Sequence, residues 1–204
     1  MSVLAVRRIQ SGSMLNLSYV VSSGDKAAVV DPSFAGVKIW RTLSSESLKL
    51  EYILNTHGHA DHVSSNEFLK EKLGAPIAIH SLDAGMIGDQ ADLLLEGGER
   101  LPLGDSEIRV IHTPGHTPGS VCFLIDDCLF TGDTLFVGGW GRTDLEGGSD
   151  SDLFRSLQKL RSLDDETRVY PGHSYGGYES TIRTEKLTNP ALVARTLDEF
   201  RSLI

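Results

Sequence analysis

The chain has 204 residues, of which 40% are hydrophobic and 23% charged, and its formal net charge at pH 7 is −9. This length suffices for one domain with a sizeable core, and scattered basic residues argue against nucleic acid, whose phosphates need a positive surface. No run approaches the roughly 20 apolar residues of a membrane span, and residues 1–8 lack signal-peptide features, so we predict a cytoplasmic protein that binds neither nucleic acid nor membrane.

Short strands and amphipathic helices alternate along the chain. In chain order the predicted elements are strands at 18–21 and 27–30, a helix at 39–48, a strand at 51–55, a helix at 65–73, strands at 77–80, 107–112, 120–125 and 128–131, a helix at 153–163, a strand at 168–170 and a helix at 191–203. No repeat or linker-like run divides the chain, so we expect a single α/β domain over residues 1–204, with two packed sheets and helices outside.

The two cysteines are predicted to be free. Cys122 and Cys128 flank a hairpin candidate whose two-residue turn is Asp126-Asp127. With that turn Ile125 faces Cys128, so the two thiols belong to different cross-strand pairs. We therefore expect two buried apolar cysteines and no disulfide.

Four metal-binding side chains lie within six positions of the segment Thr56-His57-Gly58-His59-Ala60-Asp61-His62, directly after the apolar run 52–54. In an extended loop alternate residues point to the same side, so His57, His59 and Asp61 can converge, and His62 joins them where the chain turns into a helix. The small Gly58 would let the backbone approach a cation. Imidazole and carboxylate ligands suit zinc, iron or manganese.

Three further ligand candidates each follow a predicted strand: His116, Asp133 and His173. Sites built at strand ends are held by the sheet beneath them. With the first cluster they make five histidines and two carboxylates, enough for two adjacent cations. His80 and His112 lie inside apolar runs without a motif, so we interpret both as buried, hydrogen-bonded histidines.

These residues resemble the signature of the metallo-β-lactamase superfamily, in which a His-x-His-x-Asp-His motif is followed by a distant His, Asp and His. The resemblance extends from Tyr19 to Pro190. It implies a four-layer αβ/βα sandwich with two central mixed sheets and helices on the outside. The implied ligands are His57, His59 and His116 for the first metal, Asp61, His62 and His173 for the second, and Asp133 as the bridge between them.

Within the superfamily the chain is most similar to the glyoxalase II group of thioesterases. The segments 131–136, 141–145, 170–173 and 185–190 are typical of that group. Asp133 argues against a β-lactamase, since several of those enzymes carry Cys or Ser at this position. The helical C-terminal domain that supplies much of the glutathione site in glyoxalase II is not expected in this chain.

The resemblance therefore predicts a dinuclear metal-dependent hydrolase that cleaves a thioester such as S-lactoylglutathione. Two divalent metal ions, with zinc favoured and iron or manganese as alternatives, would lower the pKa of a shared water towards roughly 7. Asp61 would orient the resulting hydroxide besides binding metal, and Asp133 is the second catalytic carboxylate.

Three residues are candidates for substrate binding. Arg142 suits a substrate carboxylate because its planar fork binds bidentately, although an ion pair with Asp144 is the alternative. Tyr175 and Tyr178 would line the pocket or pack within their loop. Asp31, which follows a strand, would be either a hydrogen-bond partner of a ligand histidine or a turn cap.

Other activities stay open. The chain also resembles persulfide dioxygenases, which hold a single iron with a subset of these ligands, through the segments 141–144 and 173–177, although their usual Asp is Ser174 here. A lactone hydrolase is a further alternative. A metal-binding protein without activity is disfavoured because no ligand is missing. A homo-oligomer is possible on this sequence.

Overall fold

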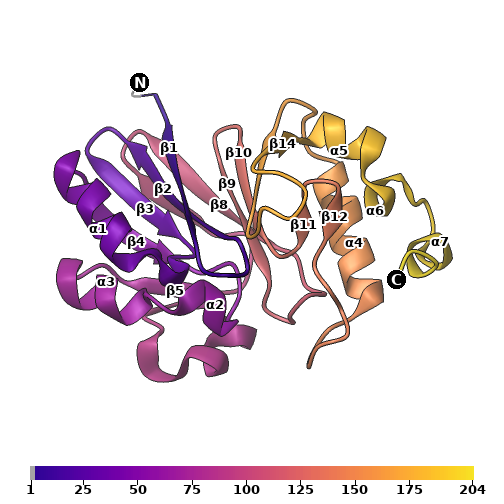
Figure 1. Ribbon diagram of the computed structural model, residues 1–204, viewed down its shortest axis with the longest axis horizontal. Coiled ribbons are helices and arrows are strands. Elements are labelled where there is room, and N and C mark those ends of the chain that lie inside the picture. The colour runs from indigo at the N-terminus through magenta and orange to yellow at the C-terminus, as the bar shows by residue number, and fades with distance from the viewer. Residues whose placement is uncertain (1–2) are drawn as a thin grey trace.

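Two six-stranded sheets face each other in the computed structural model, which describes residues 3–204 (Figure 1). The first sheet has the order β1-β2-β3-β4-β5-β6. Its strands are β1 (Ala5–Ser11), β2 (Asn16–Ser23), β3 (Lys26–Val30), β4 (Lys49–Leu54), β5 (Ile77–His80) and β6 (Leu93–Leu95). The first three strands pair antiparallel, whereas β3 to β6 pair in parallel.

The second sheet has the order β14-β13-β10-β9-β8-β7. Its strands are β7 (Arg100–Leu103), β8 (Ser106–His112), β9 (Val121–Ile125), β10 (Cys128–Gly132), β13 (Arg168–Pro171) and β14 (Ser180–Thr181). Only β10 and β13 pair in parallel. A two-stranded hairpin, β11 (Leu135–Phe136) and β12 (Gly139–Trp140), lies in the segment that follows β10.

Helices cover the outer face of each sheet (Figure 1). Beside the first sheet lie η1 (Ser33–Ala35), α1 (Gly36–Ser45), α2 (Ala60–Val63), α3 (Asn66–Leu73) and the 3-10 segment η2 (Ser81–Gln90). Beside the second lie α4 (Asp150–Arg161), α5 (Ile182–Thr188), α6 (Pro190–Val193) and α7 (Leu197–Arg201). Helices α1, α3 and α4 are amphipathic and pack their apolar sides onto the sheets.

Three apolar layers hold the molecule together. In the central layer Tyr19 of the first sheet packs against Phe130 of the second, with ring centroids 5.2 Å apart. A second cluster lies between the first sheet and helices α1 and α3, and a third between the second sheet and α4 to α7. The layers are therefore helix, sheet, sheet and helix, which confirms the predicted αβ/βα sandwich.

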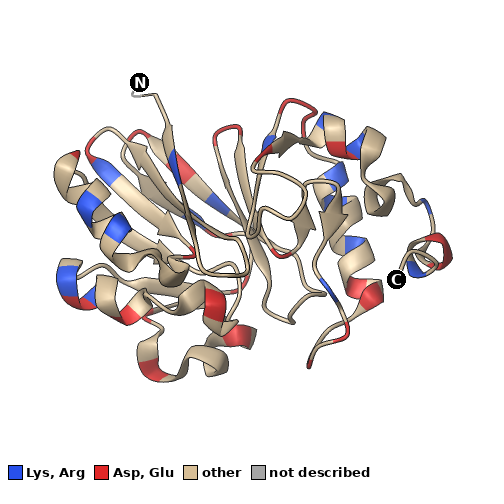
Figure 2. Ribbon diagram, viewed as in Figure 1, with Lys and Arg blue, Asp and Glu red and all other residues tan. Residues whose placement is uncertain are grey.

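Helix α4 shows how local sequence determines an element's bounds. The hydroxyl of Ser149 accepts a hydrogen bond from the backbone N–H of Asp152 and so caps the helix N-terminus. Acidic side chains occupy the first turn and basic ones the last, as the charge colouring of Figure 2 shows. This distribution of charge stabilises the helix, because each end carries side chains of the charge opposite to that end of the helix dipole. The helix begins at Asp150, three residues before its predicted start, because the cap precedes the apolar stripe.

The predicted helix over 191–203 is wrong, because two short helices occupy this segment. Asn189 caps α6 and Thr196 caps α7, each through a side-chain oxygen. Between them Ala194 has an extended ψ of 131°, so the helix cannot continue. The sequence prediction also gave no bounds for β1, η1, α2, η2, β6, β7, β14, α5 and the hairpin of β11 and β12, whose short or irregular runs lack a clear period.

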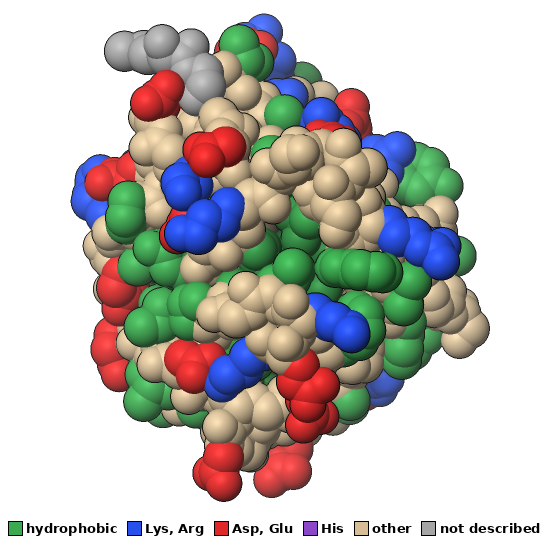
Figure 3. Space-filling view, turned by 90° about the vertical axis from the view of Figure 1, so that its left-hand side faces the viewer, with side chains coloured by type: hydrophobic (Ala, Val, Ile, Leu, Met, Phe, Trp, Pro, Cys, Tyr) green, Lys and Arg blue, Asp and Glu red, His purple; other side chains and the backbone are tan. Residues whose placement is uncertain are grey.

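The outer face of the first helical layer is solvated. Figure 3 shows charged side chains beside apolar ones on this face, with no histidine in view. None of the helices within residues 3–204 has both the length and the apolar character that crossing a bilayer requires.

The cysteine region has the predicted register. Ile125 pairs with Cys128 across the hairpin of β9 and β10, and Asp126 adopts a positive φ of 51° in its turn. Both cysteines are free and buried. Burial raises the pKa of the Cys122 thiol to about 11 and that of Cys128 to about 12.

We expect neither thiol to react with a thiol reagent such as DTNB in the native protein. The thiolate is the reactive form, and both raised pKa values and burial suppress it at neutral pH. Timed DTNB titration with and without denaturant measures this. Two thiols should react only after unfolding, and rapid labelling of the native protein would contradict the packing of this hairpin.

Candidate metal centre

All seven predicted ligands gather at one edge of the two sheets. The loop after β4 carries His57 and His59, and helix α2 carries Asp61 and His62. The loop after β8 carries His116, whereas Asp133 is the first residue after β10 and His173 the second after β13. The side chains of His57, His62, His116 and His173 are each at most 3% exposed. Four strands therefore hold a buried polar cluster in place.

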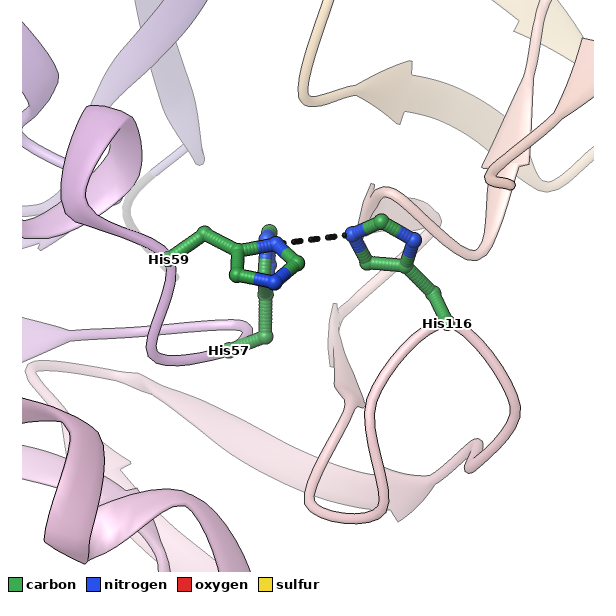
Figure 4. A group of neighbouring side chains, drawn as sticks. All are labelled: His57, His59 and His116. Carbon is green, nitrogen blue, oxygen red and sulfur yellow. Dashed lines mark hydrogen bonds between the residues drawn. The ribbon is translucent and has the colours of Figure 1, made fainter. Parts of the chain in front are cut away.

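The first group comprises His57, His59 and His116, whose ligand atoms lie within 4.8 Å of one another. Figure 4 shows the three rings turned toward a common point. Nδ1 of His59 lies 3.0 Å from Nε2 of His116. This trio has the composition of a three-histidine metal site.

The second group comprises Asp61, His62 and His173, again with ligand atoms within 4.8 Å of one another. Oδ2 of Asp61 lies 3.5 Å from Nε2 of both His62 and His173. The two Nε2 atoms are 3.1 Å apart. A second cation can therefore be held beside the first.

Asp133 lies between the two groups. Its Oδ1 is 3.4 Å from Nε2 of His62, and its Oδ2 is 3.3 Å from Nε2 of His173. The same Oδ2 is 3.7 Å from Nε2 of His116, a member of the first group. One carboxylate thus reaches both groups, as a bridging ligand must.

Hydrogen bonds outside the cluster fix the tautomers of two histidines. Nδ1 of His116 donates to the carbonyl oxygen of Arg142, and Nδ1 of His173 donates to that of Met14, both over 2.8 Å. A carbonyl oxygen only accepts, so each Nδ1 carries the proton in the neutral ring. Each Nε2 therefore presents its lone pair to the cluster, which is how ligand histidines are oriented.

Asp31 fixes the tautomers of the two remaining buried histidines, directly for His62 and through Thr56 for His57. Its carboxylate accepts hydrogen bonds from the backbone N–H and hydroxyl of Thr56, over 2.8 and 2.6 Å, and faces Nδ1 of His62 at 3.0 Å. Because the Thr56 hydroxyl donates to Asp31, its oxygen can accept from Nδ1 of His57, 3.1 Å away. Of the two roles predicted for Asp31, the structure shows the one beside a ligand histidine.

The donor set fits divalent cations. Nε2 of His57 and Oδ1 of Asp133 are buried without a hydrogen-bond partner, which is costly unless something else binds them. Two neutral imidazoles that face each other through their lone pairs also repel, as Nε2 of His62 and of His173 would at 3.1 Å. A proton or a cation between them removes that repulsion.

The charges of the cluster point the same way. Burial lowers the pKa of His57 far below its ordinary value, so this ring is neutral and ready to bind metal. Burial opposes ionisation of Asp133, but nearby His62 outweighs it and holds the pKa of this carboxyl well below its usual range. Burial lowers the pKa of His62, but the carboxylates of Asp133 and Asp31 outweigh burial and hold this pKa well above its ordinary value. Cation binding must therefore displace protons from the cluster.

Asp83 was not predicted, yet it joins the two ligand loops. Its buried carboxylate accepts hydrogen bonds from the N–H of Gly58 at 3.1 Å, the hydroxyl of Thr117 at 2.7 Å and the N–H of Gly119 at 2.7 Å. The first donor lies between His57 and His59, and the other two follow His116 within its loop. No sequence motif marks Asp83, because its partners come from distant segments.

Asn16 was also missed. Its Nδ2 donates to Oδ2 of Asp61 at 2.8 Å, and its backbone forms an isolated bridge with His173. The side chain is fully buried at the start of β2. Asn16 therefore orients one carboxylate of the second group and positions the strand end that carries its histidine.

The predicted role of Gly58 needs correction. A Cβ atom at this position would lie 2.6 Å from Cβ of Met86. The missing side chain makes room for η2 rather than for a cation.

The histidines outside the cluster stack on each other. The rings of His80 and His112 lie 4.1 Å apart at 17°, and they join β5 of one sheet to β8 of the other. Nδ1 of His80 accepts from the N–H of Leu82, and Nε2 of His112 lies 2.9 Å from the carbonyl oxygen of Pro118. Both are hydrogen-bonded as predicted, although His112 is only half-buried at the end of its strand.

Two of the predicted substrate residues line a cavity of about 470 Å³ beside the centre. We call it the Arg142 pocket; its walls include His116, Asp133, Phe136, Trp140, Arg142 and Tyr175. Tyr175 stacks on His173, with centroids 4.8 Å apart. The guanidinium of Arg142 forms a bidentate ion pair with Asp144, with both bonds at 2.6 Å.

Tyr178 lies outside the Arg142 pocket, contrary to its predicted position. Its ring lies under the guanidinium of Arg8, with 4.3 Å between the ring centroid and Cζ. Its hydroxyl donates to Gln10 on β1. The cation–π contact draws the side chain toward the first sheet and away from the cavity.

Comparison with known proteins establishes the family. A family model described as "Metallo-beta-lactamase superfamily" matches residues 14–173, most of the chain and every ligand candidate. The chain belongs to the metallo-β-lactamase superfamily, as its motifs predicted.

Two of the curated relatives illustrate the range of names in the family. The chain is 36% identical over 179 residues to "Hydroxyacylglutathione hydrolase" of Pelagibacter ubique, covering 86% of this chain and 72% of that protein. It is 38% identical over 176 residues to "Beta-lactamase hydrolase-like protein" of Agrobacterium fabrum, covering 75% of this chain. The match spans only 41% of that longer relative.

Solved structures share the fold throughout. ETHE1 from Myxococcus xanthus has a TM-score of 0.90 and 32% identity, over 98% of this chain and 89% of the other. TTHA1623 in a di-iron-bound form has a TM-score of 0.79 and 36% identity, over 91% and 99%. The BLEG-1 B3 metallo-beta-lactamase has a TM-score of 0.87 and 30% identity, over 93% and 100%.

We expect Asp83→Asn to weaken metal binding about 10- to 100-fold, the usual effect of losing a group that orients the ligands. The amide keeps one accepting oxygen but turns its NH2 toward a donor that Asp83 now satisfies. Titration with zinc against a chromogenic chelator measures the affinity.

Asp89→Asn is the matched control, since Asp89 is an exposed carboxylate on the same segment η2. It should bind metal like the parent protein. Equal affinities for both variants and the parent would show that the two ligand loops do not depend on Asp83.

Proposed function

We propose that this protein is a dinuclear metal-dependent hydrolase of the glyoxalase II type that cleaves a thioester. The observation that supports this proposal most directly is the position of Asp133, whose two oxygens face both groups of ligands. The names of two similar proteins support the proposal: a hydroxyacylglutathione hydrolase and a structure in a di-iron-bound form.

The ligands divide as the superfamily signature implies. One cation would be held by His57, His59 and His116 and the other by Asp61, His62 and His173. Asp133 would be a ligand of both. Zinc is our first choice for both positions, because nitrogen and carboxylate donors suit it, and iron or manganese suits the same set. When bound, such a pair lowers the pKa of a shared water and polarises a carbonyl oxygen.

The chain's own residues orient the reacting groups. Asn16 binds Oδ2 of Asp61, which leaves Oδ1 of this carboxylate to accept a hydrogen bond from the attacking water. Backbone carbonyls hold the Nδ1 protons of His116 and His173, so these rings cannot turn away during the reaction. No serine or cysteine nucleophile is required.

The Arg142 pocket is the proposed site of the thiol carrier. Tyr175 stacks on His173 and meets Phe136 edge to face, which gives the pocket a rigid aromatic wall beside the cluster. Arg142 can bind a substrate carboxylate if it exchanges its exposed partner Asp144, an exchange that costs little at the surface. We also propose that the substrate is a small molecule and that the protein acts in the cytoplasm. A homo-oligomer is compatible with this function.

A second candidate is a mononuclear iron persulfide dioxygenase. The observations that favour it are the similarity to the structure of ETHE1 from Myxococcus xanthus and the segments 141–144 and 173–177, which resemble persulfide dioxygenases. In that case only part of the ligand set would bind metal. Lactone hydrolysis is a further possibility within the hydrolase class, because it needs the same attack on a carbonyl.

We expect anaerobically purified protein to contain about two metal ions per chain and to release thiol from S-lactoylglutathione. Elemental analysis gives the metal content, and DTNB follows the thiol. Oxygen uptake with glutathione persulfide and hydrolysis of a β-lactam are measured on the same sample. About one iron per chain with oxygen uptake would overturn the hydrolase in favour of the dioxygenase.

The variant Asp133→Asn tests whether Asp133 bridges two metal ions. An amide bridges two cations poorly, so the variant should lose the second metal ion and at least 100-fold in thioester cleavage, the scale on which single catalytic groups act. The exposed carboxylate of Asp198 on α7 supplies the control variant Asp198→Asn, which should match the parent. A variant at 133 with full metal content and activity is incompatible with a bridging role.

A further inference from the structure

A second cavity opens beside the metal centre. It has a volume of about 680 Å³, within the range of small-molecule sites. We call it the Met86 groove and define it by His59, Leu82, Met86, Pro118, Leu145 and Glu146. The Arg142 pocket reaches the centre at His116, whereas the Met86 groove reaches it at His59. Because these two rings are in contact, the cavities meet at the first group of ligands.

The walls of the Met86 groove are apolar and exposed. The side chains of Leu82, Met86 and Leu145 are 61%, 48% and 37% exposed. Two come from η2 and the third from the loop after β12, so segments far apart in sequence contribute to one surface. Large apolar side chains gathered around a hollow next to a polar centre mark a site for an apolar ligand group.

Met86 is fixed close to the ligand loop. Its side chain lies where a Cβ at position 58 would be, so it packs on the backbone between His57 and His59. Methionine is unbranched and flexible, and it adapts to ligands of different length. An apolar group in the groove would therefore begin within contact distance of the metal centre.

The charge of the groove excludes an anion. Asp83 contributes to the wall, but its carboxylate is fully buried and accepts three hydrogen bonds. Glu146 is then the charge that the groove presents, and within the described residues no lysine or arginine lines it. The Arg142 pocket, by contrast, contains a guanidinium.

We propose that the Met86 groove is the acyl subsite and that the preferred substrates carry a straight, uncharged acyl chain of several carbons. This inference rests on the proposed thioesterase function. A thioester carbonyl carbon bears sulfur on one side and the acyl chain on the other. With that carbon at the metal centre, the thiol carrier extends into the Arg142 pocket and the chain into the groove. Hydrolysis breaks the carbon–sulfur bond, and water supplies the hydroxyl of the acid and the proton of the thiol.

The test uses glutathione thioesters that differ only in the acyl group: acetyl, butyryl, hexanoyl, octanoyl and the anionic adipoyl. The specificity constant kcat/KM should rise about fourfold per added methylene, because burial of one CH2 is worth about 0.8 kcal/mol. Adipoyl should fall at least tenfold below hexanoyl, since its carboxylate meets Glu146 without a cation. Thiol release measures every member of the series.

Leu82→Glu should bring the ratio of octanoyl to acetyl kcat/KM close to one, because it places a second charge in the groove on an exposed side chain. Leu187→Ala, at a leucine on α5 that is 74% exposed, should retain the parent's ratio. A flat profile in the parent, or an unchanged ratio in Leu82→Glu, would overturn the acyl subsite. If no member of the series is cleaved, the thioesterase function itself fails, so the two failures are distinguishable.

Discussion

The carboxylate of Asp31 is the interaction on which the metal centre depends. It stands at the end of β3 with a positive φ of 44°, and it binds both the backbone and the hydroxyl of Thr56 at the end of β4. Through His62 it also reaches α2. One buried anion thus aligns two parallel strand ends with the ligand helix, and it sets which nitrogen of His62 faces the cluster. Its own burial is tolerable only because all these partners are present.

The centre is held from the outside by a shell of polar groups rather than by the ligands alone. Asp83 binds the first ligand loop to the loop of His116, while Asn16 binds Asp61 to the strand end of His173. Such partners restrict the ligands before any cation arrives, which lowers the entropy lost on binding. The two sheets contribute ligands from both sides, so their mutual packing determines the separation of the two groups.

The two cavities differ in chemical character, so they can orient a substrate across the metal centre. The Arg142 pocket combines an aromatic wall with a guanidinium, whereas the Met86 groove is apolar and, among the residues that the structure describes, presents Glu146 as its one exposed charge. A substrate with unlike ends would therefore bind in one orientation. This asymmetry comes from two long connections, η2 and the loop after β12, while the strands beneath supply the ligands. Variation in such loops changes the substrate without disturbing the metal centre.

The seven candidate ligands that the structure brings together, and the four-layer fold, were predicted from the sequence alone. The ligand segments lie in the connections that follow predicted strands, and β5 occupies the predicted residues 77–80, because a periodic apolar pattern is a local property. The other features of the site depend on how the chain folds. The roles of Asp83 and Asn16 became recognisable through partners from distant segments. Tyr178 lies outside the Arg142 pocket because its ring packs against the guanidinium of Arg8. Side-chain direction and long-range hydrogen bonds depend on how the sheets pack, and no local pattern encodes that packing.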